Sequence, residues 1–481
     1  MTTALKTSPR YYPSMRAAWI PLAALCLAFF VEMVDNTLLT IALPTIGRDL
    51  GGSTTALQWI TAGYALTFGG LLLTAGSIAD RFGRKRVLMI GLALFGLISI
   101  GVAWVSTANE LIALRAALGI AAAMMAPITN SLVFRLFETD ELRRKAMTIM
   151  IVVGMSGFVL GPLIGGTVLA HVSWHWLLLV NAPIALIAII GVRFGVPADD
   201  KDGLTDDKLD IPGALLSIAT IGLACYTATS GVENGWLSLP TIAIGLGAIA
   251  SLIAFIWRER TARYPMLDLA LFRTGPVRGA AIAQAGAALA MAGVMFSLIL
   301  HFQYAYGWSP LVAGLANLPI IVTMLVASPL AEWLVKRYGQ RVACVIGSSV
   351  LTTALVAMAW AVPNGYPAIA ACMVLFTVGL RVVLTTAAIA LINAMPENRT
   401  SVGAALNDTA QEVGTSVGTA LIGTLIATLV ATVLPNGVWS AELVAHFFHG
   451  EQIAYLVMAV VVGAISIGGS LVLTGSRVAE E

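Results

Sequence analysis

Four acidic residues stand inside long apolar segments of the sequence, in two pairs whose spacing suits the binding of protons or cations. Glu32 and Asp35 are three positions apart in the first such segment. Asp408 and Glu412 are four positions apart near the end of the chain. Residues at these spacings share one face of a helix. A charge in a bilayer costs at least about 2.5–3.5 kcal/mol, so these acids are candidates for function. The alternative for the first pair is a solvated place near the outer interface.

The composition is that of a membrane protein. The chain has 481 residues, of which 58% are hydrophobic and 11% charged, with a mean hydropathy of +0.90. Soluble domains have roughly 25% charged residues, so we expect an all-α polytopic membrane protein. The four cysteines lie in apolar segments without metal-like spacing and read as small buried hydrophobes.

Apolar segments long enough to cross a bilayer give the expected topology. We count fourteen, near residues 17–44, 54–78, 87–106, 109–136, 146–170, 174–195, 211–231, 237–257, 279–305, 310–335, 342–362, 366–394, 401–434 and 452–475. Of the 27 lysines and arginines, all but Arg48, Arg115 and Arg381 fall on one face of this topology. The positive-inside rule therefore predicts a multi-pass protein of the cell (inner) membrane with cytoplasmic N and C termini.

A weak internal repeat predicts two equivalent halves. The string Arg81-Phe-Gly83 corresponds to Arg337-Tyr-Gly339 at an offset of 256 residues, and Leu163-Ile-Gly165 corresponds to Leu421-Ile-Gly423 at an offset of 258. We expect a six-helix half over residues 1–196, a linker with two inserted helices over 197–278, and a second six-helix half over 279–481. Transporters built from such repeats bind substrate between the repeats, near the midplane of the bilayer.

The loop after the second segment carries the most specific string, Gly76-Ser-Ile-Ala-Asp80-Arg81-Phe-Gly83-Arg84-Lys85-Arg86. A loop that only sets topology explains its arginines but not its aspartate and glycines. The string closely resembles the loop signature of the major facilitator superfamily, and this resemblance implies a cytoplasmic latch between helices. The second copy departs from the signature, because Lys336 stands where Asp80 would align.

Two further strings strengthen this resemblance. Leu114-Arg115-Ala-Ala-Leu-Gly119 is similar to the arginine motif of the superfamily, which implies a buried arginine linked to proton transfer; the alternative is an arginine that reaches a nearby interface. The glycine-rich string of the fifth segment resembles the antiporter motif, and its characteristic members are Gly157, Gly161, Pro162 and Gly165. Glycines at four-residue spacing permit close helix contact, and packing alone is the alternative.

The string from Asp35 to Pro44 resembles the first-span signature of fourteen-span drug:proton antiporters of the QacA and SmvA type. Trp174-His-Trp176 followed by Asn181-Ala-Pro183 is similar to the entry of that family's sixth span. The resemblance covers essentially the whole chain. It implies a major facilitator fold with two inserted helices, and a monomer.

The resemblance implies proton-coupled multidrug efflux. No nucleotide-binding, metal-ligand or nucleophile pattern suggests an enzyme or a cofactor. An ion gradient then supplies the energy. We expect Asp35, Asp408 and Glu412 to share proton exchange and the binding of lipophilic cations, with Glu32 as an accessory acid and Arg115 in coupling. The resemblance implies quaternary ammonium compounds and dyes as substrates, and no nucleic acid is expected as a partner.

Two rival functions remain open from the sequence. The first keeps the fold but exports a lipid, siderophore, amino acid or anionic metabolite. An anionic cargo would favour Arg115 or Arg381 as ligands. The second is a non-transporting membrane receptor. We also expect His301 to be an interfacial polar residue, and residues 435–450 to include a short amphipathic helix at the outer interface.

Overall fold

The computed structural model describes residues 11–197, 199, 210–263, 265, 269–394, 400–430, 434–435 and 439–473, and these residues form helices and their connections without any strand. The N-terminal helices are α1 (Trp19–Leu50), α2 (Thr54–Phe82), α3 (Arg84–Gly101), η1 (Val102–Trp104), α4 (Ala108–Ala123), α5 (Ala126–Arg135), α6 (Asp140–Leu169), α7 (Trp174–Leu179) and α8 (Asn181–Gly195). The helices α9 (Ile211–Asn234) and α10 (Leu239–Thr261) follow.

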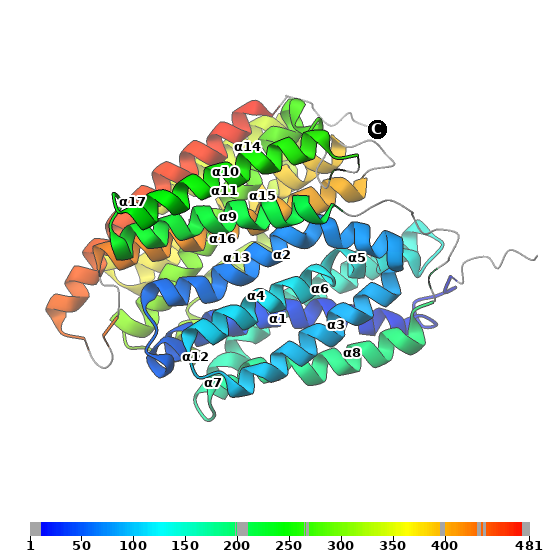
Figure 1. The fold of residues 1–481 in the computed structure, drawn as a ribbon, viewed down its shortest axis with the longest axis horizontal. Helices are drawn as coiled ribbons and strands as arrows, with labels where there is room; N and C mark the ends of the chain where they lie inside the picture. The colour runs from blue at the N-terminus through cyan, green and yellow to red at the C-terminus, as the bar shows by residue number, and fades with distance from the viewer. Residues whose placement is uncertain are drawn as a thin grey trace, which may run out of the picture.

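The C-terminal helices are η3 (Leu271–Arg273), α11 (Gly275–Leu300), the π-helix η4 (His301–Ala305), α12 (Pro310–Leu315), α13 (Leu318–Val326), α14 (Ser328–Ala361), η5 (Val362–Asn364), α15 (Tyr366–Asn393), α16 (Thr400–Leu429) and α17 (Ala441–Val472). In Figure 1, α1–α8 occupy the lower part of the bundle, and α9, α10 and α17 lie in the upper part. The helices α2 and α16 pack side by side between them, α9 packs on both, and α10 packs on α9.

Eleven helices within the described residues are long and apolar enough to cross a membrane, or twelve if the bent halves of α2 count as one span. The predicted class, an all-helical polytopic membrane protein, is therefore confirmed. The expected number of fourteen exceeds this count, because α6 and the short apolar helices α12 and α13 are not among the eleven or twelve.

Polar residues begin several helices, as the sequence of their first turns dictates. The Ser53 hydroxyl accepts a hydrogen bond from the backbone N–H of Ala56 at the start of α2, and Ser440 caps α17 in the same way. Thr107 and Glu110 form a reciprocal capping box at α4. Such caps satisfy backbone donors that have no partner inside the helix.

Two glycines with positive φ angles stand at equivalent turns. Gly83 has φ +97° between α2 and α3, and Gly339 has φ +81° within α14, which it divides into two helical parts. Side chains disfavour this region of backbone conformation, so glycine is the residue that fits. These are the two glycines that the predicted repeat aligns.

The hydrophobic core differs between the two ends of the bundle. We call the end where α2 meets α3 the basic end, because Arg81, Arg84 and Arg86 lie there; it is on the right in Figure 1. One large cluster joins α11–α17 to the later part of α1, from Val34 to Ile46. A second cluster lies wholly between Ala18 and Val196 and includes the earlier part of α1. The N- and C-terminal helices thus share a core at the opposite end and have separate cores toward the basic end.

Candidate functional site

Asp35 of α1 is bound on both carboxylate oxygens by residues of other helices. Arg115 of α4 donates through Nη1 to Oδ2 of Asp35 in an ion pair. Asn181, at the start of α8, donates through Nδ2 to Oδ1 at 2.6 Å. The Asp35 and Arg115 side chains are 0% and 1% exposed. A buried pair of this kind fixes three helices relative to one another, since loss of either partner leaves an uncompensated charge.

Arg115 is held inside the bundle. Its guanidinium lies 4.5 Å from the ring centroid of Tyr64 on α2, a distance suited to cation–π attraction. Asn36 offers Oδ1 at 3.5 Å. The arginine therefore does not extend to an interface, which was the alternative interpretation of its motif.

Glu32 lies one turn before Asp35 and is 2% exposed. Its Oε2 has no hydrogen-bond partner within the part of the chain that the structure describes. The charged groups that act on Glu32 are the three other predicted acids, Glu412, Asp408 and Asp35. The structure thus brings the three other acids within electrostatic range of Glu32, and gives Glu32 no ion pair within the described residues.

Asp408 and Glu412 share one face of α16 and are half-buried. Asn407 donates to Asp408 at 3.1 Å. Glu412 packs against α2 at Gly69, where a Cβ atom would come within 2.5 Å of the Glu412 Cβ. The close approach of α2 and α16 therefore depends on the missing side chain at position 69.

The arrangement of these groups suits the exchange of protons for a cation. Four carboxylates and one guanidinium carry an excess of negative charge when all are ionised. Low dielectric disfavours such an excess, so a proton or a bound cation stabilises the site. No group of His, Cys, Asp and Glu in the described ranges has the geometry to hold a metal ion.

The predicted latch loop binds the end of α8. Asp80 pairs with Arg84 at 2.7 Å, and the carboxylate of Asp199 accepts from the backbone N–H of Lys85 at 3.1 Å. The Lys85 ammonium donates to the Val196 carbonyl at 2.5 Å. Asp80 therefore lies beside the arginines, as the sequence indicated.

The remaining members of the predicted loop have distinct surroundings. A Cβ atom at Gly76 would meet nothing within 4 Å. The Arg81 guanidinium lies 5.5 Å from the Phe82 ring, and the backbone N–H of Arg86 lies 3.5 Å from Asp199. The latch role itself stays a prediction.

The glycines of α6 form its contact with α1. A Cβ at Gly157 would lie 3.2 Å from Met33 Cβ, and one at Gly165 would lie 3.1 Å from Leu38. At Gly161 a Cβ would collide with Thr37. The side chain of Pro162 lies outside the described residues. Because this part of α1 also carries Glu32 and Asp35, the glycine string positions the acids.

Comparison with known sequences agrees with this geometry. The sequence matches the family model described as the Major Facilitator Superfamily over residues 25–419. The chain belongs to this superfamily. It is 31% identical over 416 residues to the multidrug efflux pump LfrA of Mycolicibacterium smegmatis, covering 86% of this chain and 82% of LfrA. It is 34% identical over 324 residues to the methyl viologen resistance protein SmvA of Salmonella typhimurium, covering 67% of this chain and 65% of SmvA.

Solved structures agree on the major facilitator fold. A bacterial homologue of the human lysosomal transporter Spinster superposes with a TM-score of 0.66 at 15% identity, covering 94% of this chain and 97% of that chain. A peptide transporter, POT, gives a TM-score of 0.64 at 16% identity, covering 94% and 95%. The superfamily fold is therefore present across nearly the whole chain.

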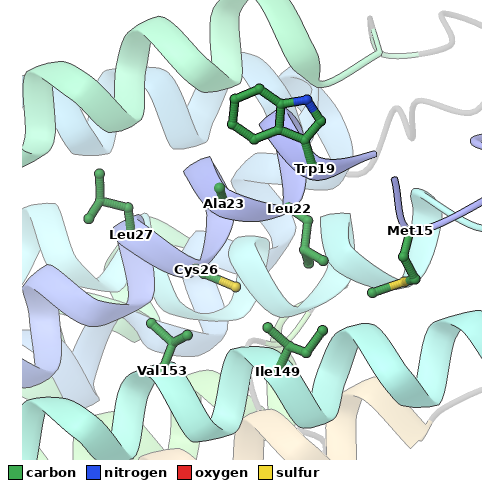
Figure 2. Close-up of a pocket in the computed structure, with 8 residues that line it drawn as sticks. All are labelled: Met15, Trp19, Leu22, Ala23, Cys26, Leu27, Ile149 and Val153. Carbon is green, nitrogen blue, oxygen red and sulfur yellow. The ribbon is translucent and has the colours of Figure 1, made fainter. Parts of the chain in front are cut away.

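An apolar pocket lies between the first part of α1 and α6, and none of the four acids lines it (Figure 2). It has a volume of about 480 Å³ and is lined by Met15, Trp19, Leu22, Ala23, Cys26, Leu27, Ile149 and Val153. Figure 2 shows Leu22 and Cys26 of α1 pointing toward Ile149 and Val153 of α6. None of the lining residues is charged, so this pocket offers apolar contact alone.

One expectation about a polar residue needs correction. His301 is fully buried and lies 2.6 Å from Glu451 of α17, so it is not an interfacial residue. Arg381 donates to Ser328 at 3.1 Å and is acted on by Glu332. Glu451 was not predicted as a site residue, because it precedes the expected last span. The available signal was its position directly before the apolar run that begins at Ile453.

Replacing Gly161 by alanine is expected to lower the stability of the protein by about 1–3 kcal/mol, because the new methyl group overlaps Thr37. The matched control is Gly468→Ala, where a Cβ atom meets nothing within 4 Å. The control is expected to leave stability unchanged or raise it by up to about 1 kcal/mol, since alanine favours helices. Thermal unfolding in detergent measures both, and equal effects would contradict the packing role of the glycine string.

Proposed function

We propose that the chain is a proton-coupled multidrug efflux antiporter of the fourteen-span type, which exports lipophilic cations such as quaternary ammonium compounds and dyes. The observation that carries the proposal is the cluster of four acids from α1 and α16, of which Glu32 is buried and forms no ion pair within the described part of the chain. The similarity to LfrA and SmvA supports the same class of activity.

Fourteen spans follow if α6 and the segment from Pro310 to Gly339 are added to the twelve counted helices. The helix α6 has 30 residues and packs along α1. The positive φ of Gly339 divides α14 into two parts, and the first part would complete one span with α12 and α13. The aligned turns at Gly83 and Gly339 support two six-helix halves, and the basic end would face the cytoplasm.

The conformation in the structure fits a state open toward the cytoplasm. At the end opposite the basic end, Gln303 donates through Nε2 to the Ile41 carbonyl at 2.9 Å. Tyr304 donates to the Pro44 carbonyl at 3.2 Å. The shared core lies at the same end, whereas the cores toward the basic end are separate. We therefore assign the opposite end as the closed outer gate.

In the proposed cycle, Glu32, Asp408 and Glu412 bind the cation or protons in competition. Asp35 takes part in the cycle through its ion pair with Arg115. A proton or cation bound at Glu32, one turn away, changes the electric field that acts on this ion pair. Because Asp35 also holds Asn181, a change in the pair is transmitted to α8. The glycine contact between α1 and α6 allows α1 to shift, and the Asp80 loop responds at the cytoplasmic end.

The rival with an anionic cargo has less support. An anion needs an available cationic ligand, yet Arg115 is paired with Asp35 and Arg381 donates to Ser328. The acid cluster would repel an anion.

Dye accumulation in inverted membrane vesicles tests the proposed function. A pH gradient, acidic inside, is expected to drive uptake of a cationic dye, and quaternary ammonium compounds are expected to compete with it. Anionic compounds of similar size serve as the control. Competition by the anions alone, or uptake that persists after the gradient is collapsed, would contradict the proposal.

A further inference from the structure

A second buried titratable cluster lies in the C-terminal helices, away from the four acids. Glu451 of α17 accepts a hydrogen bond from the Ser297 hydroxyl of α11 at 2.6 Å. Its other oxygen lies 2.6 Å from Nδ1 of His301. All three side chains are fully buried. Burial of a carboxylate and an imidazole costs free energy that burial of an apolar pair would not. We therefore treat this cluster as a candidate functional site.

Aromatic side chains surround the His301 side of this cluster. The His301 ring stacks on Phe448 at 5.0 Å and meets Tyr306 edge-on at 4.5 Å. The titratable groups that face the cluster from neighbouring elements are Tyr455 of α17, Tyr306 beyond η4, and Cys372 of α15 through Tyr455. No lysine or arginine forms an ion pair with Glu451 among the described residues.

One nitrogen atom of the cluster is available to bind a proton. Nε2 of His301 is buried and has no hydrogen-bond partner within the described part of the chain. With Nδ1–H donated to an ionised Glu451, the cluster has a net charge of −1. A proton added to Nε2 makes an imidazolium, which pairs with the Glu451 carboxylate and brings the net charge of the cluster to zero.

The cluster is joined directly to the contacts that close the opposite end. His301 is the first residue of the π-helix η4, which also contains Gln303 and Tyr304. These two residues donate to carbonyls of α1, and the Arg48 guanidinium lies 5.4 Å from the Tyr304 ring. Single-turn π-helices are frequent at functional sites. Protonation of His301 therefore acts on the segment that holds α1.

We propose that Ser297, His301 and Glu451 form a second proton-binding site, in which His301 takes one proton and thereby stabilises the closed outer gate. The sidedness of the site rests on the proposed function. Loss of the proton leaves a net negative cluster that favours hydration, so the gate opens. The proton leaves Nε2 to water and no other bond changes.

Distances between spin labels at the outer end test the proposal. Labels at Ser173→Cys and Asn364→Cys, both exposed at that end, report gate opening in a background from which the four buried native cysteines are removed. In the parent protein the ratio of open to closed gate is expected to rise with pH, by up to about tenfold per unit as one proton is lost.

Variants of Glu451 and His301 distinguish a proton-binding site from a cluster with only a structural role. Glu451→Gln and His301→Gln are each expected to weaken the pH dependence by the contribution of this site, because neither can form the imidazolium–carboxylate pair. Ser466→Ala, a buried polar position elsewhere on α17, is expected to retain it. Parent-like pH dependence in either Gln variant would overturn the proposal. Should one Gln variant fail to fold, the other decides.

The contribution of Glu451 is separable from that of the four-acid site. Glu32→Gln with Glu412→Gln is expected to leave the part of the pH response that depends on Glu451 intact. If that double variant loses cation transport while Glu451→Gln keeps the parent pH dependence, the proposed function survives and this inference is wrong. If gate distances depend on Glu451 but cation transport is absent from the parent protein, the inference stands and the proposed substrate is wrong.

Discussion

Arg115→Ala is expected to destabilise the protein by about 3–5 kcal/mol, because it leaves Asp35 buried and charged with only Asn181 as a donor. It is also expected to abolish dye efflux, since the pair links α1, α4 and α8. Thermal unfolding in detergent and efflux from whole cells measure the two effects separately.

The double variant Arg115→Ala with Asp35→Asn is the matched control for the lost charge. It removes both charges and is expected to recover most of the stability lost by Arg115→Ala alone, but not the efflux. Arg115→Lys keeps the charge but has a single ammonium in place of the planar guanidinium, and is expected to retain part of both. Recovery of full efflux in the double variant would contradict the coupling role of the pair.

Glu32→Gln and Glu412→Gln are each expected to weaken binding of a quaternary ammonium compound by about 10- to 100-fold, since charge-assisted contacts contribute about 1.5–3 kcal/mol. Both variants are expected to be at least as thermally stable as the parent, because each removes one of several mutually repelling carboxylates. Equilibrium binding to purified protein measures the affinity.

Glu442→Gln is the control for a change of net charge, because Glu442 is exposed in the first turn of α17. It is expected to leave affinity unchanged. Affinity losses of the same size in Glu442→Gln and Glu412→Gln would indicate a long-range charge effect and would contradict direct recognition at the cluster.

Much of the fold and part of the site followed from the sequence. Apolar length, composition and the glycine loops predicted a helical membrane bundle of the superfamily. Helical spacing predicted that Asp408 and Glu412 share a face, and the structure brings them into electrostatic range of Glu32. The shared face of Asp408 and Glu412 could be predicted because spacing within one helix fixes the direction of each side chain relative to its neighbours.

Contacts between helices were harder to predict from the sequence. The pairing of Arg115 with Asp35 depends on how α4 is rotated against α1, and no periodicity within either segment determines that rotation. The sequence also favoured Asp35 over Glu32 as the principal acid. The structure engages both oxygens of Asp35 and leaves Glu32 Oε2 without a partner among the described residues.

The Glu451 cluster was missed because of a helix boundary. We expected the last span to begin at residue 452 and a separate interfacial helix before it. Instead α17 begins at Ala441 and runs without interruption to Val472, so residues 441–450 form its first turns. Glu451 thus lies inside a long helix, facing Ser297 and His301, where the sequence suggested the end of a loop.

Proton release on cation binding is the measurement that tests the central claim most directly. When a quaternary ammonium compound is added to purified protein in weakly buffered detergent, the parent is expected to release protons in proportion to the compound bound. The double variant Glu32→Gln with Glu412→Gln is expected to release none, and Glu442→Gln to match the parent. Cation binding by the parent without proton release, or unchanged release from the double variant, would contradict competition between protons and cations at these acids.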